Sequence, residues 1–216
     1  MNVSVYSQES HAAFVMRMRA GGIADTSLLK AFETVRRQDF LAPEWRGAAW
    51  SSGMLPIGCG EAMESIDLQA RIIGALDIKG GERVLEIGTG SGYTAAVMAT
   101  LGARIVTIDR YRTLCAEASA RFEKAALSIG VRHADGTKGL PGEGPFDRVI
   151  VWAAFDQLPR FLADQIASNG ILVTPIGLPE EPQGIVKLTK VGSRFDREEI
   201  GHTRLQPLIA GLSAKL

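Results

Sequence analysis

The sequence predicts an α/β protein with a Rossmann-like sheet that is mostly parallel and covered by helices on both faces. Three observations lead to this fold class. Short apolar strands alternate with helices between residues 83 and 175. A glycine-rich turn follows the first of these strands. Two further strands, at 185–190 and 200–208, have no helix between them, which fits an antiparallel pair at the edge of the sheet.

The N-terminal part, up to residue 80, is predicted to be helical apart from one long loop. A helix over 11–20 ends at a glycine pair, and a second helix begins at Asp25 or Thr26, either of which can cap it. Repeated glycine and proline predict a loop at 39–60. A third, amphipathic helix follows, with its apolar residues on one face at Leu68, Ile72, Ile73 and Leu76.

From residue 83 onward the pattern becomes a regular alternation of strands and helices. We expect strands at 83–87, 104–108, 131–134, 147–152 and 170–175, and helices at 93–101, 114–129 and 158–166. Strands this short and apolar are typical of a parallel sheet that is buried on both faces.

The composition is that of an ordinary soluble protein, in which 24 Lys and Arg residues balance 24 Asp and Glu residues. This balance argues against a general affinity for nucleic acids or anionic membranes. The four basic residues of the first helical region, Arg17, Arg19, Arg36 and Arg37, are expected on solvated helix faces.

The cellular compartment and the absence of a metal site are predicted from motifs that we do not find in the sequence. We see neither a secretory signal nor an apolar run long enough to span a membrane. Cys59 and Cys115 form no C-x-x-C pair, so we expect a protein of the reducing cytoplasm. His11 and His202 lack acidic or cysteine partners at metal-ligand spacing, and we expect no metal site.

The turn after the first core strand reads Gly88-Thr89-Gly90-Ser91-Gly92. Glycines there let the backbone approach a ligand, at the sheet edge where doubly wound folds bind ligands. A dinucleotide site is the competing interpretation, but its G-x-G-x-x-G pattern requires a glycine where this chain has Tyr93. Glu86 would repel a pyrophosphate, whereas it suits a ligand that carries an ammonium and a sulfonium. The turn therefore favours S-adenosylmethionine as the cofactor.

Residues after the next two strands complete the predicted cofactor site. Asp109 ends the second core strand and can accept hydrogen bonds from both ribose hydroxyls, and we include the adjacent Arg110 in the site. Asp135 and Gly136 follow the third strand, where a carboxylate can accept the adenine amino group. An Asp-Gly pair is also a common turn signal, so a structural role for Asp135 stays open.

Six motifs together resemble the protein-L-isoaspartate O-methyltransferases. They are LPIGCGE at 55–61, RVLEIGTGSGY at 83–93, ADG at 134–136, PFDRVIVWAA at 145–154, NGILVTPIG at 169–177 and RLQPL at 204–208. The resemblance implies a seven-stranded class I methyltransferase sheet with an N-terminal helical extension and a C-terminal antiparallel strand pair. It also implies methyl transfer from S-adenosylmethionine to the α-carboxylate of L-isoaspartyl residues in damaged proteins. The ester then collapses to a succinimide, which allows repair to aspartate.

The resemblance also implies an organisation for the whole chain. We expect a single methyltransferase domain, 1–216, with N-terminal helices and a substrate loop (1–80), a cofactor-binding core (81–178) and C-terminal strands (179–216). A monomer is favoured, and the expected partner is a protein or peptide substrate, or a small-molecule acceptor.

The segment that should contact the methyl acceptor departs from the family pattern G-x-G-Q-T-I-S. This chain has Glu61 for Gln, Ala62 for Thr and Glu64 for Ser. An ionised Glu64 about 4 Å from an anionic acceptor would repel it by roughly 4 kcal/mol at an effective dielectric constant of about 20. Trp152 also replaces the usual Thr after the fourth strand, and its bulk is expected to narrow the acceptor pocket.

Several interpretations of this departure stay open. In one, a register shift lets Ser65 supply the hydroxyl, and the chain remains a repair enzyme. In another, Glu61 or Glu64 is a general base or binds a cation, and the acceptor is an amine, a hydroxyl or another nucleophile. In a third, the acids merely face solvent. The non-enzymatic alternative is a module that binds the cofactor without transferring its methyl group.

Overall fold

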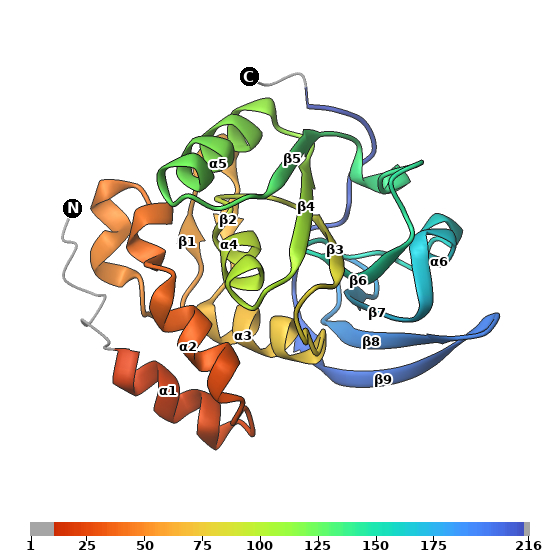
Figure 1. The fold of residues 1–216 in the computed structure, drawn as a ribbon, viewed down its shortest axis with the longest axis horizontal. Helices are drawn as coiled ribbons and strands as arrows, with labels where there is room; N and C mark the ends of the chain where they lie inside the picture. The colour runs from red at the N-terminus through yellow and green to blue at the C-terminus, as the bar shows by residue number, and fades with distance from the viewer. Residues whose placement is uncertain (1–10, 214–216) are drawn as a thin grey trace.

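Seven strands form one sheet in the order β5-β4-β3-β6-β7-β8-β9 (Figure 1). The computed structural model describes residues 11–213. The strands are β3 (Arg83–Ile87), β4 (Arg104–Asp109), β5 (Gly130–His133), β6 (Phe146–Val151), β7 (Ile166–Ile176), β8 (Gln183–Val191) and β9 (Arg194–Thr203). The strands from β5 to β7 in this order are parallel, whereas β8 is antiparallel to both β7 and β9. The predicted Rossmann-like fold with a C-terminal antiparallel strand pair is confirmed.

The described α-helices are α1 (His11–Ala20), α2 (Thr26–Thr34), α3 (Ile66–Ala75), α4 (Tyr93–Thr100), α5 (Arg112–Lys124) and α6 (Arg160–Gln165). Asp25 caps α2, because its carboxylate accepts hydrogen bonds from the N–H groups of Ser27 and Leu28. Arg17 on α1 pairs with Asp67 on α3 at 2.9 Å, so the expectation that Arg17 is merely solvated was wrong. Within residues 11–213, no helix is both long and apolar enough to cross a membrane.

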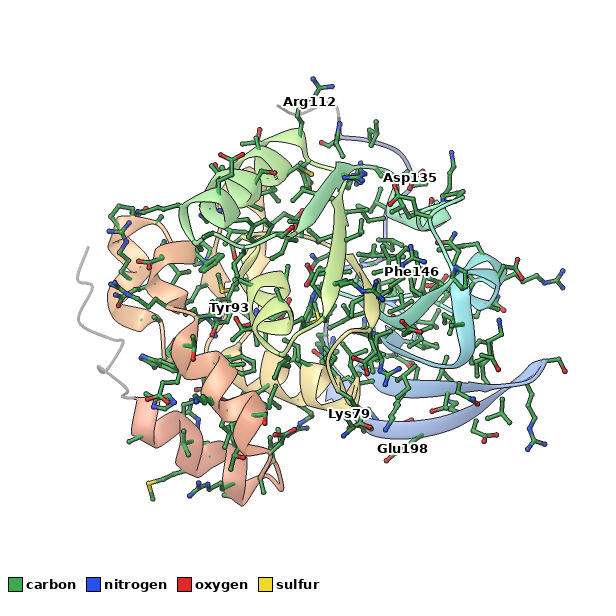
Figure 2. The ribbon with its side chains drawn as sticks, viewed as in Figure 1. Lys79, Tyr93, Arg112, Asp135, Phe146 and Glu198 are labelled. Atoms are coloured by element: carbon green, nitrogen blue, oxygen red, sulfur yellow. The ribbon has the colours of Figure 1, made fainter. Side chains whose placement is uncertain are left out.

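The buried side chains of the strands alternate between two hydrophobic cores, one on each face of the sheet. On β3, Val84 belongs to the core that α1 to α5 complete, and its neighbour Leu85 belongs to the core that Leu162 of α6 completes. Figure 2 shows Tyr93 between the N-terminal helices and the sheet, where its ring packs edge-on against Phe32. The predicted cover of helices on both faces is thereby confirmed.

The last strand does not lie where the sequence predicted it. We expected a strand at 200–208, but β9 runs from Arg194 to Thr203 and forms the outer edge of the sheet (Figure 1). Most of its side chains are exposed, so the charged stretch from 194 to 199 lacks the apolar alternation of a half-buried strand. Pro207, which has no backbone N–H, lies in the segment that leaves the sheet after β9.

This segment returns across the sheet instead of extending it. The Leu205 N–H donates to the Gln183 side-chain oxygen at 2.9 Å. The Ala154 N–H donates to the Gln206 carbonyl at 2.9 Å, and the Leu208 N–H donates to the Ala154 carbonyl at 3.0 Å. These bonds hold residues 206–208 beside the end of β6, where the functional site lies.

Candidate functional site

The order of the strands reverses beside β3. From β3 the chain continues outward to β4 and β5, and then returns to β6 on the other side of β3. Open α/β sheets bind ligands outside the carboxyl ends of their strands at such a reversal. The structure has a pocket at this position, closed by the short antiparallel pair β1 (Leu55–Pro56) and β2 (Ala62–Met63) and by residues 206–209.

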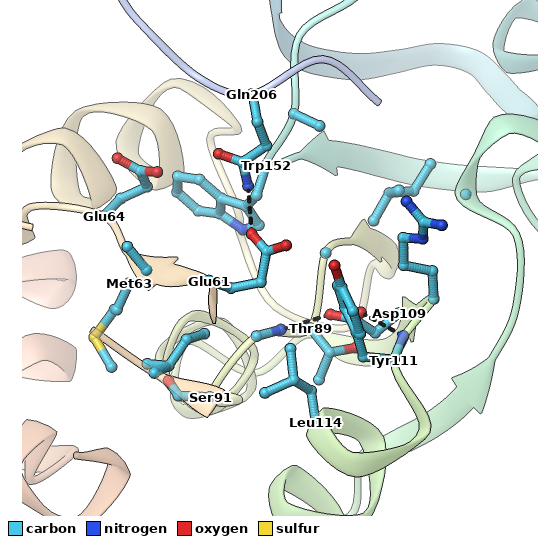
Figure 3. Close-up of a pocket in the computed structure, with 18 of the residues that line it drawn as sticks. Glu61, Met63, Glu64, Thr89, Ser91, Asp109, Tyr111, Leu114, Trp152 and Gln206 are labelled. Atoms are coloured by element: carbon cyan, nitrogen blue, oxygen red, sulfur yellow. Dashed lines mark hydrogen bonds between the residues drawn. The ribbon is translucent and has the colours of Figure 1, made fainter. Parts of the chain in front are cut away.

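Nine of the thirteen predicted site residues line this pocket: Glu61, Glu64, Gly88, Thr89, Gly90, Ser91, Asp109, Arg110 and Gly136. Figure 3 shows Glu61 and Glu64 on the same side as Trp152 and Gln206, whereas Asp109, Tyr111 and Leu114 lie on the opposite side. The pocket therefore joins a glycine-loop and Asp109 end to an end that contains the two glutamates.

The glycine loop is held against the end of β4 by backbone hydrogen bonds. The N–H groups of Gly88 and Thr89 both donate to the Ile108 carbonyl, at 2.8 and 3.2 Å. The Gly90 N–H donates to the Asp109 carboxylate at 2.9 Å. Gly88 and Gly90 have φ values of 98° and 51°, a region that favours glycine, and this backbone conformation explains why both positions are glycine.

Asp109 is 7% exposed, and its exposed part faces the pocket. One carboxylate oxygen accepts the Gly90 N–H, and the other accepts the Tyr111 N–H at 3.0 Å. Burial raises the pKa of Asp109, although these backbone hydrogen bonds oppose the rise. Each oxygen retains a further lone pair, so the carboxylate can accept two more hydrogen bonds from a ligand.

Glu64 lies at the other end and is 7% exposed. The buried Arg37 lies beneath it, where its guanidinium donates to the Glu64 backbone carbonyl at 2.7 Å and to the Met63 sulfur at 3.2 Å. The same guanidinium lies over the Tyr93 ring. Burial raises the pKa of Glu64 to about 7, although the positive charge of Arg37 opposes the rise.

Glu61 connects three segments at the mouth of the pocket. The Gln206 amide donates to its carboxylate at 3.1 Å (Figure 3). The Tyr111 hydroxyl also hydrogen-bonds to Glu61. Because Gln206 and Tyr111 come from other segments, Glu61 connects the β1–β2 loop to the chain after β4 and to the chain after β9.

The sequence model of a protein family, described as protein-L-isoaspartate(D-aspartate) O-methyltransferase, matches residues 9–212. The protein-L-isoaspartate O-methyltransferase of Rhizobium meliloti is 44% identical over 202 residues, which cover 93% of this chain and 99% of that protein. The enzyme of the same name from Azorhizobium caulinodans is 41% identical over 217 residues and covers 100% of both chains. The chain belongs to the protein-L-isoaspartate O-methyltransferase family.

Solved structures show the same fold. A putative protein-L-isoaspartate O-methyltransferase from Plasmodium falciparum, in complex with S-adenosyl-L-homocysteine, superposes with a TM-score of 0.78 at 20% identity, covering 93% of this chain and 99% of that one. A second protein-L-isoaspartate O-methyltransferase gives a TM-score of 0.82 at 24% identity, covering 94% of this chain and 67% of that one. The fold of this family member is therefore that of the isoaspartyl methyltransferases.

Glu86 does not line the pocket of this family member, although we predicted that it contacts the cofactor. It is fully buried, and its carboxylate accepts hydrogen bonds from Thr94 at 2.5 Å, Thr107 at 2.7 Å and the Trp152 indole at 3.0 Å. Burial raises its pKa to about 7, although these three hydrogen bonds oppose the rise. Since Thr94 and Trp152 line the pocket, Glu86 orients two residues of its wall, and a direct contact between Glu86 and the cofactor stays a prediction.

Gly92 also does not line the pocket. It precedes α4 with a φ of 88°, and a Cβ atom there would lie 2.8 Å from the Phe122 ring of α5. That glycine serves the packing of α4 against α5, and its contact with the cofactor stays a prediction.

Two further predicted contacts, Asp135 and Ser65, lie outside the pocket lining. One Asp135 oxygen accepts both the N–H and the hydroxyl of Thr137, at 3.0 and 2.7 Å, so this carboxylate stabilises a turn. The Ser65 hydroxyl accepts the Leu68 N–H at 3.2 Å and caps α3. The register shift that would give Ser65 the acceptor role is not seen.

Arg37 was missed because nothing in the local sequence separates it from Arg36. The two are adjacent, but Arg37 begins a 3₁₀ turn, Arg37–Phe40, and is 1% exposed, whereas Arg36 faces solvent. A buried arginine that supports the backbone of Glu64 thus replaces the predicted solvated residue. Gln69 and Tyr93 of the lining were also not predicted as contacts of the cofactor or the acceptor.

The free energy of unfolding is expected to fall between pH 4.5 and about 7 because of Glu64. Its pKa in the folded protein, about 7, lies above its ordinary value of 4.5, so the folded state binds more protons in this window. The stabilisation that Glu64 contributes is fully present below pH 4.5 and is lost as the pH rises through about 7. Thermal unfolding of the wild type and of Glu64→Gln, which does not titrate, checks this. The melting temperature of the wild type relative to the variant should fall with pH, and a constant difference would contradict it.

Proposed function

We propose that this chain transfers the methyl group of S-adenosylmethionine to the α-carboxylate of L-isoaspartyl residues in proteins and peptides. One observation carries the proposal: a continuous pocket joins the glycine loop and Asp109 to Glu61 and Glu64, in a member of the isoaspartyl methyltransferase family. Such a pocket can hold the methyl donor and the methyl acceptor next to each other, which is the main requirement of a direct methyl transfer.

The residues at the glycine-loop end fit the cofactor. A Cβ atom at Gly88 would lie 3.1 Å from the Trp152 Cβ, and one at Gly90 would lie 3.3 Å from the Ile57 side chain, so a larger residue at either position would crowd this wall. Asp109 would hold the ribose hydroxyls, and Gly136 flanks the same end of the pocket. When bound, S-adenosylmethionine supplies an electrophilic methyl group on a sulfonium.

A carboxylate acceptor suits the other end. Its oxygen is already a nucleophile, so the chain needs to orient it and to exclude water, and no side chain has to remove a proton. Met63, Tyr93 and Trp152 supply apolar walls there. The second candidate is an amine or hydroxyl acceptor, which is favoured by the position of Glu64 as a buried carboxyl that faces the pocket.

Methyl transfer to an isoaspartyl peptide, compared with the same peptide carrying an ordinary aspartyl residue, tests the proposal. We expect methyl ester on the isoaspartyl peptide and background incorporation on its twin, because the two differ only in which carboxylate is free. Equal incorporation on both peptides would rule out isoaspartyl recognition. A peptide with neither residue, but with free amines and hydroxyls, detects the second candidate.

We further propose that the enzyme acts in the cytoplasm as a monomer and that residues 1–216 form a single domain, divided as the sequence suggests. The unbroken seven-stranded sheet supports a single domain, the family resemblance favours a monomer, and two cysteines that form no disulfide fit a reducing compartment. Light scattering after size exclusion checks the oligomeric state.

A further inference from the structure

The Glu64 carboxyl is buried at the acceptor end without a hydrogen-bond or salt-bridge partner. Within residues 11–213 no side chain donates a hydrogen bond to this carboxyl and none forms a salt bridge with it, since Arg37 reaches only the Glu64 backbone carbonyl and otherwise acts through its charge alone. The nearby Arg37 directs two of its nitrogens elsewhere, to the Glu64 backbone carbonyl and to the Met63 sulfur. An unpaired carboxylate is costly to bury, and such a group retains its proton instead.

The other ionisable groups around Glu64 do not change this balance. Arg37, in the 3₁₀ turn at 37–40, contacts its backbone, whereas Tyr93 of α4 and Glu61 line the same pocket. Asp67 of α3 acts on Arg37 through its charge. Glu86 lies behind Trp152 and is another buried acid. Among these groups only Arg37 lowers the pKa of Glu64, and burial outweighs it.

We propose that Glu64, in its protonated form, donates a hydrogen bond to the reactive carboxylate of the isoaspartyl substrate. This inference rests on the proposed function. The family pattern has a serine at this position, and a carboxylic acid O–H keeps the donor that a serine hydroxyl supplies. Two carboxyl groups that share one proton avoid the repulsion that two carboxylates would experience at close range. Glu64 would thus determine specificity, because its protonated form allows an anionic substrate to bind beside it.

The chemistry of the transfer agrees with a donor and not with a base. An oxygen of the substrate carboxylate forms the new bond to the methyl carbon, the bond from that carbon to sulfur breaks, and its electron pair stays on sulfur. No proton is released, so Glu64 keeps its proton from substrate binding to product formation. A general base would instead be required for a hydroxyl or ammonium acceptor, and it would act only when ionised.

The dependence of kcat/KM on pH separates these roles. For the wild type acting on an isoaspartyl peptide, kcat/KM should fall by about tenfold for each pH unit above the pKa of Glu64. Glu64→Gln keeps a neutral donor of similar size, so it should retain activity within about threefold at low pH and lose the fall at high pH. Glu64→Ala has no donor, and its activity should be reduced by about 10- to 100-fold at low pH, with no further fall.

Glu198→Gln is the matched control, because Glu198 is exposed on β9, at the outer edge of the sheet and far from Tyr93 (Figure 2). It should reproduce the wild-type profile. Titration of each variant with S-adenosylhomocysteine shows that the cofactor end is intact and that the variant is folded.

Three outcomes would overturn the inference, and they differ in what else they overturn. A profile that falls equally in the wild type and in Glu64→Gln would assign the titration to another group and leave the proposed function standing. A wild-type activity that rises with pH through neutrality, and is lost in Glu64→Gln, would make Glu64 a general base. If the wild type methylates no isoaspartyl peptide at any pH, the proposed function fails together with the inference.

Discussion

Replacing Asp109 with alanine is expected to weaken S-adenosylhomocysteine binding by about 1.5–3 kcal/mol, which is roughly 10- to 150-fold in Kd. The carboxylate faces the pocket and has lone pairs left for two ligand hydroxyls. Its removal also frees the N–H groups of Gly90 and Tyr111, which fix the glycine loop and the chain after β4. Isothermal titration of the wild type and the variant measures the change.

Asp25→Ala is the matched control for this substitution. Asp25 also accepts two backbone N–H groups, from Ser27 and Leu28, but it caps α2 and does not line the pocket. We expect it to lower the melting temperature and to leave the Kd for S-adenosylhomocysteine unchanged. If Asp109→Ala also left this Kd unchanged, the assignment of Asp109 to the ribose would be wrong.

Replacing Glu86 with alanine is expected to destabilise the protein by about 3 kcal/mol or more, because three buried donors lose their acceptor. The hydroxyls of Thr94 and Thr107 can rotate toward other acceptors, but the Trp152 N–H is fixed by its ring. A cavity at a fully buried position adds to the loss. Urea unfolding at constant m-value measures the change in the free energy of unfolding.

Glu86→Gln is the control here, since it keeps the volume and one acceptor oxygen. We expect it to lose less than half as much stability as the alanine variant. A loss below about 1 kcal/mol for Glu86→Ala would show that the network does not contribute to folding as we infer. Because Thr94 and Trp152 line the pocket, we also expect weaker S-adenosylhomocysteine binding in the alanine variant.

The fold could be predicted where side-chain pattern and burial coincide. Helix α1 and strand β3 have the predicted bounds. Phe14 and Met18 of α1 are buried one helical turn apart, and β3 is a short run of residues buried on both faces of the sheet. Strand β9 could not be placed, since an exposed, charged edge strand has no apolar face to reveal it. Strand β9 is held by its backbone pairing with β8, which the sequence of β9 alone does not reveal.

The candidate site was predictable in its location but not in every orientation. Parallel strands bring their carboxyl ends to one edge, so Gly90 and Asp109 converge although they lie on different segments. Strand alternation could have indicated that Glu86 shares a face with Val84 and points toward α4, yet its acidic character suggested a ligand. The burial of Arg37 depends on a 3₁₀ turn that no local pattern indicates.

The assignment of the cofactor is tested most directly by isothermal titration of the wild type with S-adenosylhomocysteine, with NAD as the comparison ligand. Tyr93 stands where a dinucleotide site needs its third glycine, and the glycine loop and Asp109 are arranged around one pocket. We expect saturable binding of one S-adenosylhomocysteine per chain and no binding of NAD. Heat from NAD alone, or none from S-adenosylhomocysteine, would contradict the account.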